Sequence, residues 1–182
     1  MKFVSRAGDK FDYAVSQFKL NLKYKICADF GCSTGGFTDC MLQNGAQKVY
    51  SIDTGYGVLD WKLRNDPRVV VMERENAMYV NLPEKMDLIS IDTSWTKQKF
   101  ILPNALKFLK PGGIIISLIK PHYEADKSML IKGKVKDEYV EEVVNKVVAE
   151  LKEMKINVIE VVKSPVLGEK GKNVEYLMLV RG

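Results

Sequence analysis

The 182-residue chain has few of the side chains that build metal and disulfide sites. It contains one histidine, His122, and three cysteines, Cys27, Cys32 and Cys40. An odd number of cysteines without a C-x-x-C pair argues against a disulfide framework or a zinc knuckle. We therefore expect reduced, partly buried thiols and no metal site. Any catalysis would have to rely on lysine, aspartate and glutamate.

The sequence also lacks a long apolar stretch. The strongest one, Ile114–Ile119, is far too short to cross a bilayer. The amino terminus does not have the charged-then-apolar layout of a signal peptide, and no linker or internal repeat divides the chain. These absences predict one cytoplasmic domain over residues 1–182 with no membrane contact, in which residues 1–25 form a basic segment and a helix that packs on the rest.

Positive charge is concentrated in three segments of the chain. The net charge is +5, yet residues 1–25 carry +4, residues 120–136 carry +3 and residues 163–172 carry +2. The remainder is therefore negative. Basic loops grouped around one face are typical of a protein that binds a polyanion such as RNA. The side chains expected to bind RNA are Arg6, Lys132, Lys134, Lys136, Lys170 and Lys172.

Short runs rich in β-branched residues alternate with helical patterns. Strands are predicted at Ile26–Phe30, Val49–Ile52, Val69–Met72, Leu88–Ile91, Ile114–Ile119, Ile156–Lys163 and Glu175–Val180. Helices are predicted from Lys10 to Phe18 and at Phe37–Gln43, Thr96–Leu109 and Asp137–Lys155, with a short turn near Leu59–Arg64 and a helix stop at residues 110–113.

This alternation predicts an α/β fold, a parallel sheet with helices on both faces. The last two strands lie too close in sequence for a crossover helix, so we expect them to form an antiparallel hairpin. A mostly parallel seven-stranded sheet that ends in such a hairpin is similar to the Rossmann-like class I methyltransferase fold. This likeness of fold carries no function by itself.

A glycine-rich segment, residues 29–37, follows the first predicted strand and opens a helix. A strand, a glycine-rich turn and a helix amino terminus together form a common nucleotide-binding device. The segment has neither the G-K-[ST] of a phosphate-binding loop nor the G-x-G-x-x-G of a dinucleotide site, which disfavours NAD. Its D-x-G-x-x-x-G pattern favours a cofactor without a diphosphate, with Asp29 facing the amino-acid end of S-adenosylmethionine.

Two polar residues after the next strands complete a predicted adenosine site. Asp53 ends the second strand at a distance from the glycines that suits the ribose hydroxyls, and Asn76 follows the third strand, where it would read the adenine edge. The residues expected to bind the cofactor are Asp29, Gly31, Ser33, Thr34, Gly35, Gly36, Phe37, Asp53, Asn76 and Asp92.

Four charged residues interrupt apolar context at the ends of predicted elements. Asp92 ends the fourth strand, Lys120 ends the fifth, Glu175 opens the last and Lys10 begins the first helix. Since the carboxyl ends of parallel strands border the ligand crevice, we expect these side chains to converge beside the cofactor. A buried structural salt bridge is the alternative interpretation.

These motifs resemble those of the FtsJ-type RNA ribose 2′-O-methyltransferases over essentially the whole chain. The likeness is carried by residues 4–10, 29–37, 118–121 and 173–175. The sequence is closer still to the TlyA (haemolysin A) branch, through residues 31–40, 53–57, 61–64, 66–69 and 119–125. The sequence departs from this branch in two ways. The branch usually begins with a small basic RNA-binding domain, whereas this sequence starts directly at the methyltransferase segment, so we expect it either to bind RNA through its own basic loops or to borrow a partner. Trp95 stands where the branch usually has phenylalanine.

The resemblance implies methyl transfer from S-adenosylmethionine to a ribose 2′-hydroxyl of RNA, with rRNA as the expected substrate. Lys10, Asp92, Lys120 and Glu175 would form the catalytic tetrad. We assign Lys120 as the proton acceptor, with burial and Lys10 favouring loss of its proton, and Asp92 and Glu175 orienting the two lysines. Lys10 is the alternative acceptor.

Other functions stay open at this point. One is a methyltransferase that acts on a protein or a small molecule, for which the basic loops would have no role. The others are a haemolytic, pore-forming protein and an inactive RNA-binding module. The missing membrane-spanning stretch disfavours the pore, and the intact tetrad disfavours the inactive module.

Overall fold

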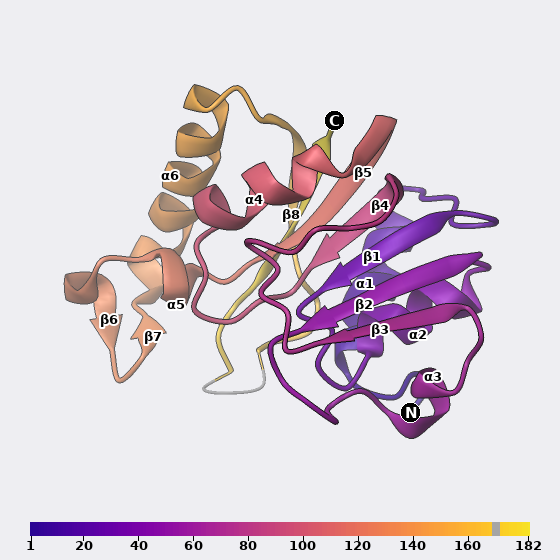
Figure 1. The fold of residues 1–182 in the computed structure, drawn as a ribbon. Helices are drawn as coiled ribbons and strands as arrows, with labels where there is room; N and C mark the ends of the chain where they lie inside the picture. Colours follow the sequence, from indigo (N-terminus) through magenta and orange to yellow (C-terminus); the bar gives the residue numbers. More distant parts are fainter. Residues whose placement is uncertain (169–171) are drawn as a thin grey trace.

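The structure, a computed structural model, describes residues 1–168 and 172–182. Its main sheet has seven strands in the order β3-β2-β1-β4-β5-β9-β8 (Figure 1). Strand β9 is antiparallel to both of its neighbours, and the other pairs are parallel, so the predicted fold is confirmed. The strands are β1 Ile26–Phe30, β2 Lys48–Asp53, β3 Val69–Glu73, β4 Met86–Ile91, β5 Leu109–Ile119, β8 Asn157–Lys163 and β9 Tyr176–Arg181.

Helices cover both faces of this sheet (Figure 1). One face carries α1 (Ala7–Gln17) and α2 (Gly36–Gln43), and the other carries α4 (Gln98–Lys107) and α6 (Val140–Glu153). Neighbouring residues of a strand point to opposite faces of the sheet. Ile115 packs in the core under α4 and α6, while Ile116 packs in the core under α1 and α2. This burial on two sides explains why the strands read as continuous apolar runs.

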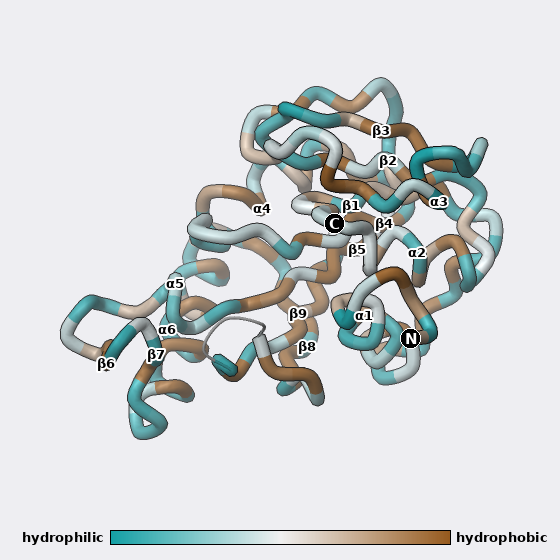
Figure 2. Tube along the Cα trace, turned by 90° about the horizontal axis from the view of Figure 1, so that it is seen from below, coloured by the Kyte–Doolittle hydropathy of each residue, from teal (hydrophilic) through white to brown (hydrophobic). Residues whose placement is uncertain are grey.

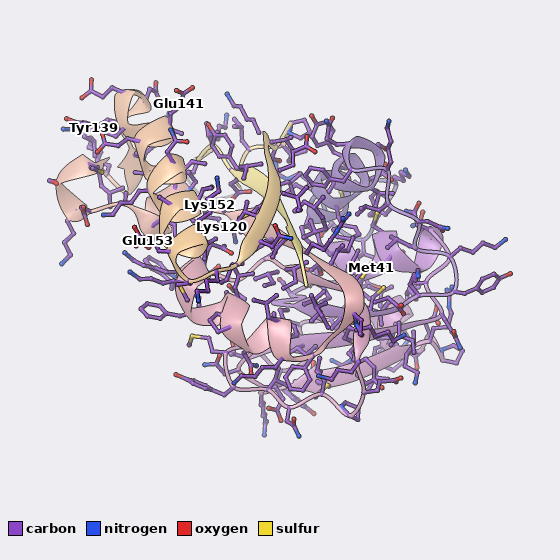
Figure 3. All side chains as sticks on the ribbon, turned by 90° about the horizontal axis from the view of Figure 1, so that it is seen from above. Met41, Lys120, Tyr139, Glu141, Lys152 and Glu153 are labelled. Carbon is purple, nitrogen blue, oxygen red and sulfur yellow. The ribbon has the colours of Figure 1, made fainter. Side chains whose placement is uncertain are left out.

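Helix α6 forms where its apolar spacing predicts a helix. Its buried residues are Val143, Val144, Val147 and Leu151. Exposed charged residues lie at both of its ends, with Glu141 near the start and Lys152 and Glu153 at the finish (Figure 3). None of the helices that the structure describes is long and apolar enough to span a bilayer.

The predicted helix does end before residues 110–113, but the strand that follows it is longer than the predicted Ile114–Ile119 and includes these residues. Helix α4 ends at Lys107, and β5 begins two residues later at Leu109. Leu109 pairs with Met86, and pairing resumes between Leu88 and Ile114 after a shift in register. The residues between these pairs form a bulge in the strand, because proline and glycine interrupt a regular ladder without ending the sheet.

A small second sheet lies between β5 and α6 and was not predicted. The single-turn helix α5 (Pro121–Glu124) leads to β6 (Leu130–Ile131) and β7 (Lys134–Val135). Lys132 and Gly133 join them with φ angles of 48° and 78°. Two positive φ angles in a two-residue loop are typical of a hairpin turn of type I′. Strands of two residues are too short to show an alternating pattern.

One edge of the sheet gathers the carboxyl ends of the parallel strands, toward which the strand arrows point in Figure 1. Figure 2 views the molecule from below. In this view the N-terminal segment with α1 lies on one side of the edge, and the β6–β7 hairpin lies on the other. Ligands of open α/β sheets bind at such an edge.

Candidate functional site

The loop between β1 and α2 passes close to the end of β4. Gly31 has a φ of 83°, and a Cβ placed on it would lie 2.7 Å from the backbone oxygen of Asp92. The amide of Asp92 also donates a hydrogen bond to the carbonyl of Phe30 at 3.0 Å. Glycine alone tolerates both this conformation and this approach. The loop is therefore held against the strand end that carries Asp92.

Three residues of the glycine-rich loop serve packing. A Cβ on Gly35 would collide with the side chain of Leu63, and one on Gly36 would collide with the start of α1 and with Ser5 just before it. Phe37 is 2% exposed, and its ring centroid lies 5.0 Å from that of Phe11 in α1. These residues hold the loop, α1 and α3 (Trp61–Arg64) together, and their contact with a cofactor stays a prediction.

Asp29 anchors the loop from below and is only 1% exposed. One carboxylate oxygen accepts hydrogen bonds from the amide and the hydroxyl of Thr38, at 3.0 and 2.7 Å, and the other accepts one from the Ser90 hydroxyl at 2.8 Å. Burial raises the pKa of Asp29 to about 6, although these hydrogen bonds oppose the shift. We expected Asp29 to face the cofactor. The structure places it in the lining of a cleft beside the loop and gives both of its oxygens protein partners, so its contact with a cofactor stays a prediction.

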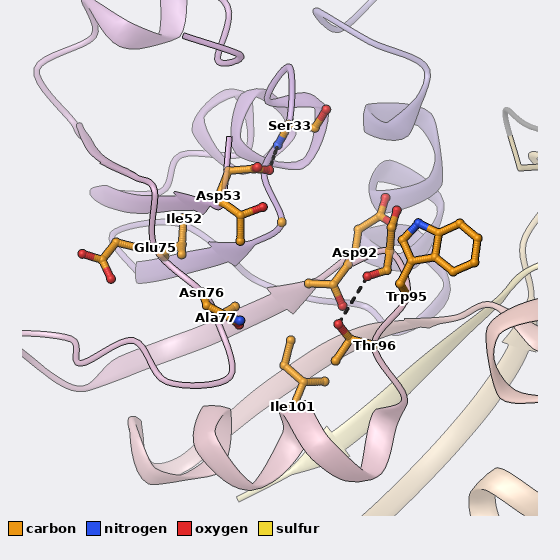
Figure 4. A pocket seen from close by; sticks show the side chains of 14 residues that line it. Ser33, Ile52, Asp53, Glu75, Asn76, Ala77, Asp92, Trp95, Thr96 and Ile101 are labelled. Atoms are coloured by element: carbon orange, nitrogen blue, oxygen red, sulfur yellow. Dashed lines mark hydrogen bonds between the residues drawn. The ribbon is translucent and has the colours of Figure 1, made fainter. Parts of the chain in front are cut away.

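A pocket at the ends of β1, β2 and β4 contains the polar residues predicted for the adenosine (Figure 4). The two carboxylate oxygens of Asp53 accept hydrogen bonds from the amides of Ser33 and Gly55, each at 2.8 Å. The side-chain oxygen of Asn76 accepts a hydrogen bond from the amide of Met78 at 3.0 Å. Both polar side chains are therefore fixed in orientation before any ligand binds.

A second cleft adjoins this pocket and contains the four predicted catalytic residues. The two hollows share Gly31, Ser33, Asp92, Ser94 and Trp95 in their linings. The second cleft alone is lined by Arg6, Lys10, Thr34, Lys120 and Glu175. Asp92 consequently stands at the boundary where groups bound in the two hollows would meet.

The four charged residues form two buried ion pairs. Lys120 Nζ lies 2.5 Å from Asp92 Oδ1, and Lys10 Nζ lies 2.6 Å from Glu175 Oε2. The exposed fractions of these side chains run from 4% to 15%. The structure thus brings the predicted tetrad into one cleft from four distant parts of the sequence. Removing one partner of a buried pair leaves an uncompensated charge, so the loss of any one of the four residues is expected to destabilise the protein.

The pKa of Lys120 lies above its ordinary value, contrary to our expectation from the sequence. Burial lowers it, but the attraction of Asp92, the hydrogen bond to Asp92 and the charge of Glu175 outweigh burial. Our expectation gave more weight to burial and to Lys10 than to these carboxylates. In the free protein Lys120 is therefore a charged ammonium.

Aromatic side chains line the mouth of the second cleft. Trp95 is 84% exposed and has a left-handed φ of 59°. Its ring centroid lies 4.8 Å from that of Tyr123, which in turn lies 4.1 Å from that of His122. Burial and the charge of Lys120 lower the pKa of His122 to about 4, so its imidazole is neutral. Tyr123 was not among the predicted site residues, and the signal for it was its position three residues after Lys120.

Most of the basic residues predicted to bind RNA lie on exposed segments around the same edge (Figure 2). The exposed ones are Arg6, Lys132, Lys134 and Lys172. Lys136 is half-buried, and its Nζ lies 5.5 Å from the ring centroid of Tyr139. Lys170 lies outside the described residues.

The fold and the two adjoining hollows define a Rossmann-like methyltransferase. Solved S-adenosylmethionine-dependent methyltransferases share the fold with TM-scores of 0.65 to 0.68 at 15% to 18% identity, a likeness that shows the fold alone. The family model of the FtsJ-like methyltransferases matches residues 3–181. The chain belongs to this family, as its motifs predicted, and S-adenosylmethionine is its methyl donor.

Individual relatives match the chain over nearly its whole length. It is 39% identical to Hemolysin A of Brachyspira hyodysenteriae, over 97% of this chain and 76% of that protein. It is 36% identical to the 16S/23S rRNA (cytidine-2′-O)-methyltransferase TlyA of Mycobacterium tuberculosis, over 98% of this chain and 68% of that protein. A solved Streptococcus thermophilus structure described as a hemolysin has 37% identity and a TM-score of 0.94, with coverage of 100% of this chain and 67% of that one.

Proposed function

We propose that the protein methylates a ribose 2′-hydroxyl of RNA, with ribosomal RNA as the substrate class and the cytoplasm as its place of action. The observation that carries the proposal is the pair of buried ion pairs, Lys120–Asp92 and Lys10–Glu175, at the junction of the two hollows. The name of the Mycobacterium tuberculosis relative states a cytidine 2′-O-methyltransferase of 16S and 23S rRNA, which supports this substrate.

In this proposal the cofactor binds in the pocket shown in Figure 4. Asp53 receives the ribose hydroxyls, because the amides of Ser33 and Gly55 hold its carboxylate in the pocket lining. Asn76 faces the adenine, and the bare backbone at Gly31 leaves room for the methionine part. The bound cofactor would supply an activated methyl group, and Asp92 lies at the boundary between this pocket and the second cleft.

The residues of the second cleft then orient the hydroxyl and accept its proton. Lys10, whose Nζ lies 2.6 Å from Glu175 Oε2, donates a hydrogen bond to the 2′-oxygen. Lys120 accepts the proton. Its pKa is raised in the free protein, but a cation bound next to Asp92 would lower it, because a second positive charge disfavours the ammonium. Holding the two reacting atoms in line supplies most of the acceleration.

The charge around the cleft supports RNA rather than a protein or a small molecule as the substrate. Arg6 lines the cleft itself, and exposed lysines occupy the β6–β7 hairpin, at Lys132 and Lys134. Phosphate contacts from such residues provide affinity that falls with salt concentration. A small-molecule substrate would give these side chains no partner.

The test is methyl transfer from labelled S-adenosylmethionine to ribosomal RNA and to isolated ribosomal subunits. Digestion to nucleosides and mass spectrometry then identify the product. We expect a 2′-O-methylnucleoside, formed at a rate that falls as salt concentration rises. A base-methylated nucleoside, or label found in ribosomal protein alone, would contradict the proposal.

A further inference from the structure

Two short segments flank the proposed reacting centre and are joined at three levels. One runs from Asp92 to Gln98, between β4 and α4, and the other runs from Lys120 to Glu124, between β5 and the end of α5. The levels are the ion pair Lys120–Asp92 at 2.5 Å, the ring pair Trp95–Tyr123 at 4.8 Å, and two hydrogen bonds to Glu124. One of these runs from the amide of Gln98 to Glu124 Oε1 at 2.8 Å, and the other from Lys97 Nζ to the backbone carbonyl of Glu124 at 3.3 Å.

The third level is the most deeply buried. Gln98 is 3% exposed and Glu124 is 7% exposed. Lys97, the N-cap residue of α4, makes no side-chain cap, so Glu124 supplies the acceptor for an amide that has no partner within the helix. The Gln98 side chain is fixed as well, because it accepts a hydrogen bond from the Ser117 hydroxyl at 2.6 Å and donates one to the Leu118 carbonyl at 3.1 Å.

We propose that Glu124 is a positioning residue of the methyl-transfer centre, acting through the amide of Gln98. This inference rests on the proposed function. By fixing where α4 starts relative to α5, Glu124 sets Lys120 against Asp92 and Tyr123 against Trp95. Glu124 is not among the residues that line either hollow, so its effect on the reaction is indirect.

The shortness of the two segments explains how this effect is transmitted. Five residues separate Asp92 from Gln98, and three separate Lys120 from Glu124. Trp95, in the first segment, holds the left-handed φ of 59° that a bulky residue adopts only when its surroundings impose it. Without the link between Gln98 and Glu124 we expect Trp95 to leave this conformation and the segment to relax.

The test compares Glu124→Ala with Glu124→Gln, whose amide oxygen accepts the same hydrogen bond. Glu150→Ala is the matched control, since Glu150 also anchors α4, through Lys99 Nζ at 3.4 Å, but does so from α6. All variants carry Trp61→Phe, which leaves Trp95 as the single tryptophan of the chain. The readouts are Trp95 fluorescence anisotropy and acrylamide quenching, cofactor affinity by calorimetry, and the single-turnover rate of RNA methylation.

For Glu124→Ala we expect lower Trp95 anisotropy, altered quenching and a single-turnover rate reduced on the order of ten- to a hundredfold, because displacement of reacting groups by about 1 Å has effects of this size. Cofactor affinity should stay unchanged. Glu124→Gln should restore the fluorescence and the rate, and Glu150→Ala should alter neither.

Unchanged Trp95 fluorescence and rate in Glu124→Ala would overturn the inference, as would an equal loss in Glu150→Ala or no rescue by Glu124→Gln. If the unsubstituted protein methylates no RNA, the proposed function fails, while the Trp95 measurements still test the positioning. If Glu124→Ala does not fold, Glu124→Asp, which withdraws the carboxylate by one methylene group, replaces it in the same comparison.

Discussion

Replacing Lys120 with alanine should abolish methyl transfer while leaving binding nearly intact. The side chain is 12% exposed, and its removal leaves the carboxylate of Asp92, itself 15% exposed, without the cation 2.5 Å away. Breaking a buried pair in this way costs about 3–5 kcal/mol. Since the cleft is open on one side, we expect a loss near the lower figure, about 3 kcal/mol in the free energy of unfolding, measured by urea denaturation.

The effect of Lys120→Ala on the rate should exceed its effect on any affinity. A positioned acid or base contributes on the order of 10²- to 10⁴-fold, and Lys120 is our candidate for that role. RNA affinity is spread over many lysines, so the loss of one recessed ammonium changes it little. Single-turnover methylation, filter binding and calorimetry with the cofactor separate these quantities.

Lys152→Ala is the matched control, because it removes an exposed lysine from the end of α6 (Figure 3). It should leave the rate and both affinities unchanged. A wild-type single-turnover rate in Lys120→Ala would refute the reasoning. Lys120 would then be a structural ion-pair partner of Asp92, and the proton would have to pass to Lys10 or to water.

Three further predictions address the cofactor pocket, the protonation of Lys120 and RNA binding. Asp53→Ala should weaken S-adenosylmethionine binding by about 1–3 kcal/mol, because it removes a half-buried hydrogen-bond acceptor from the pocket lining, and an unchanged calorimetric Kd would contradict the assignment. The single-turnover rate should rise with pH through the neutral range, because the raised pKa of Lys120 makes its neutral amine the minor form. Asp92→Asn should move this rise to lower pH, and a flat profile in the unsubstituted protein would exclude Lys120 as the acceptor. Replacing the three lysines of the hairpin region with alanine should weaken RNA binding. The slope of log binding constant against log salt concentration should flatten by about one unit for each phosphate that is no longer neutralised. The methylation rate at saturating RNA should stay near normal. Filter binding over a salt series measures the affinity and its slope for Lys132, Lys134 and Lys136.

The general position of the site could be predicted because its residues lie at element ends. Asp92 and Lys120 each follow a buried apolar run, and parallel strands bring their carboxyl ends to one edge. Asp53 follows a third run by the same rule. Lys10 and Glu175 were harder to place, since Lys10 lies within α1, which begins at Ala7, and Glu175 precedes an antiparallel strand. The family resemblance was needed to join them.

The β6–β7 hairpin and the bulge in β5 escaped the sequence patterns for a local reason. A two-residue strand shows no periodicity, and proline with glycine indicates a turn as readily as a bulge. The packing role of Gly35 and Gly36 escaped for a different reason. The side chains that fill the space beside them come from α3, from the start of α1 and from Ser5 just before it, which the sequence does not place there.

By itself, the sequence determined how the seven strands of the main sheet alternate with helices and the edge at which Asp53, Asp92 and Lys120 lie, because burial periodicity and strand polarity are local properties of the chain. The tertiary structure alone decided that Asp29 has both its oxygens occupied, that Lys120 is held as an ammonium, and that Glu124 reaches the start of α4. These properties depend on distance and burial between segments far apart in the chain. Electrostatic energies change steeply with both distance and burial, and neither quantity can be read from the sequence alone.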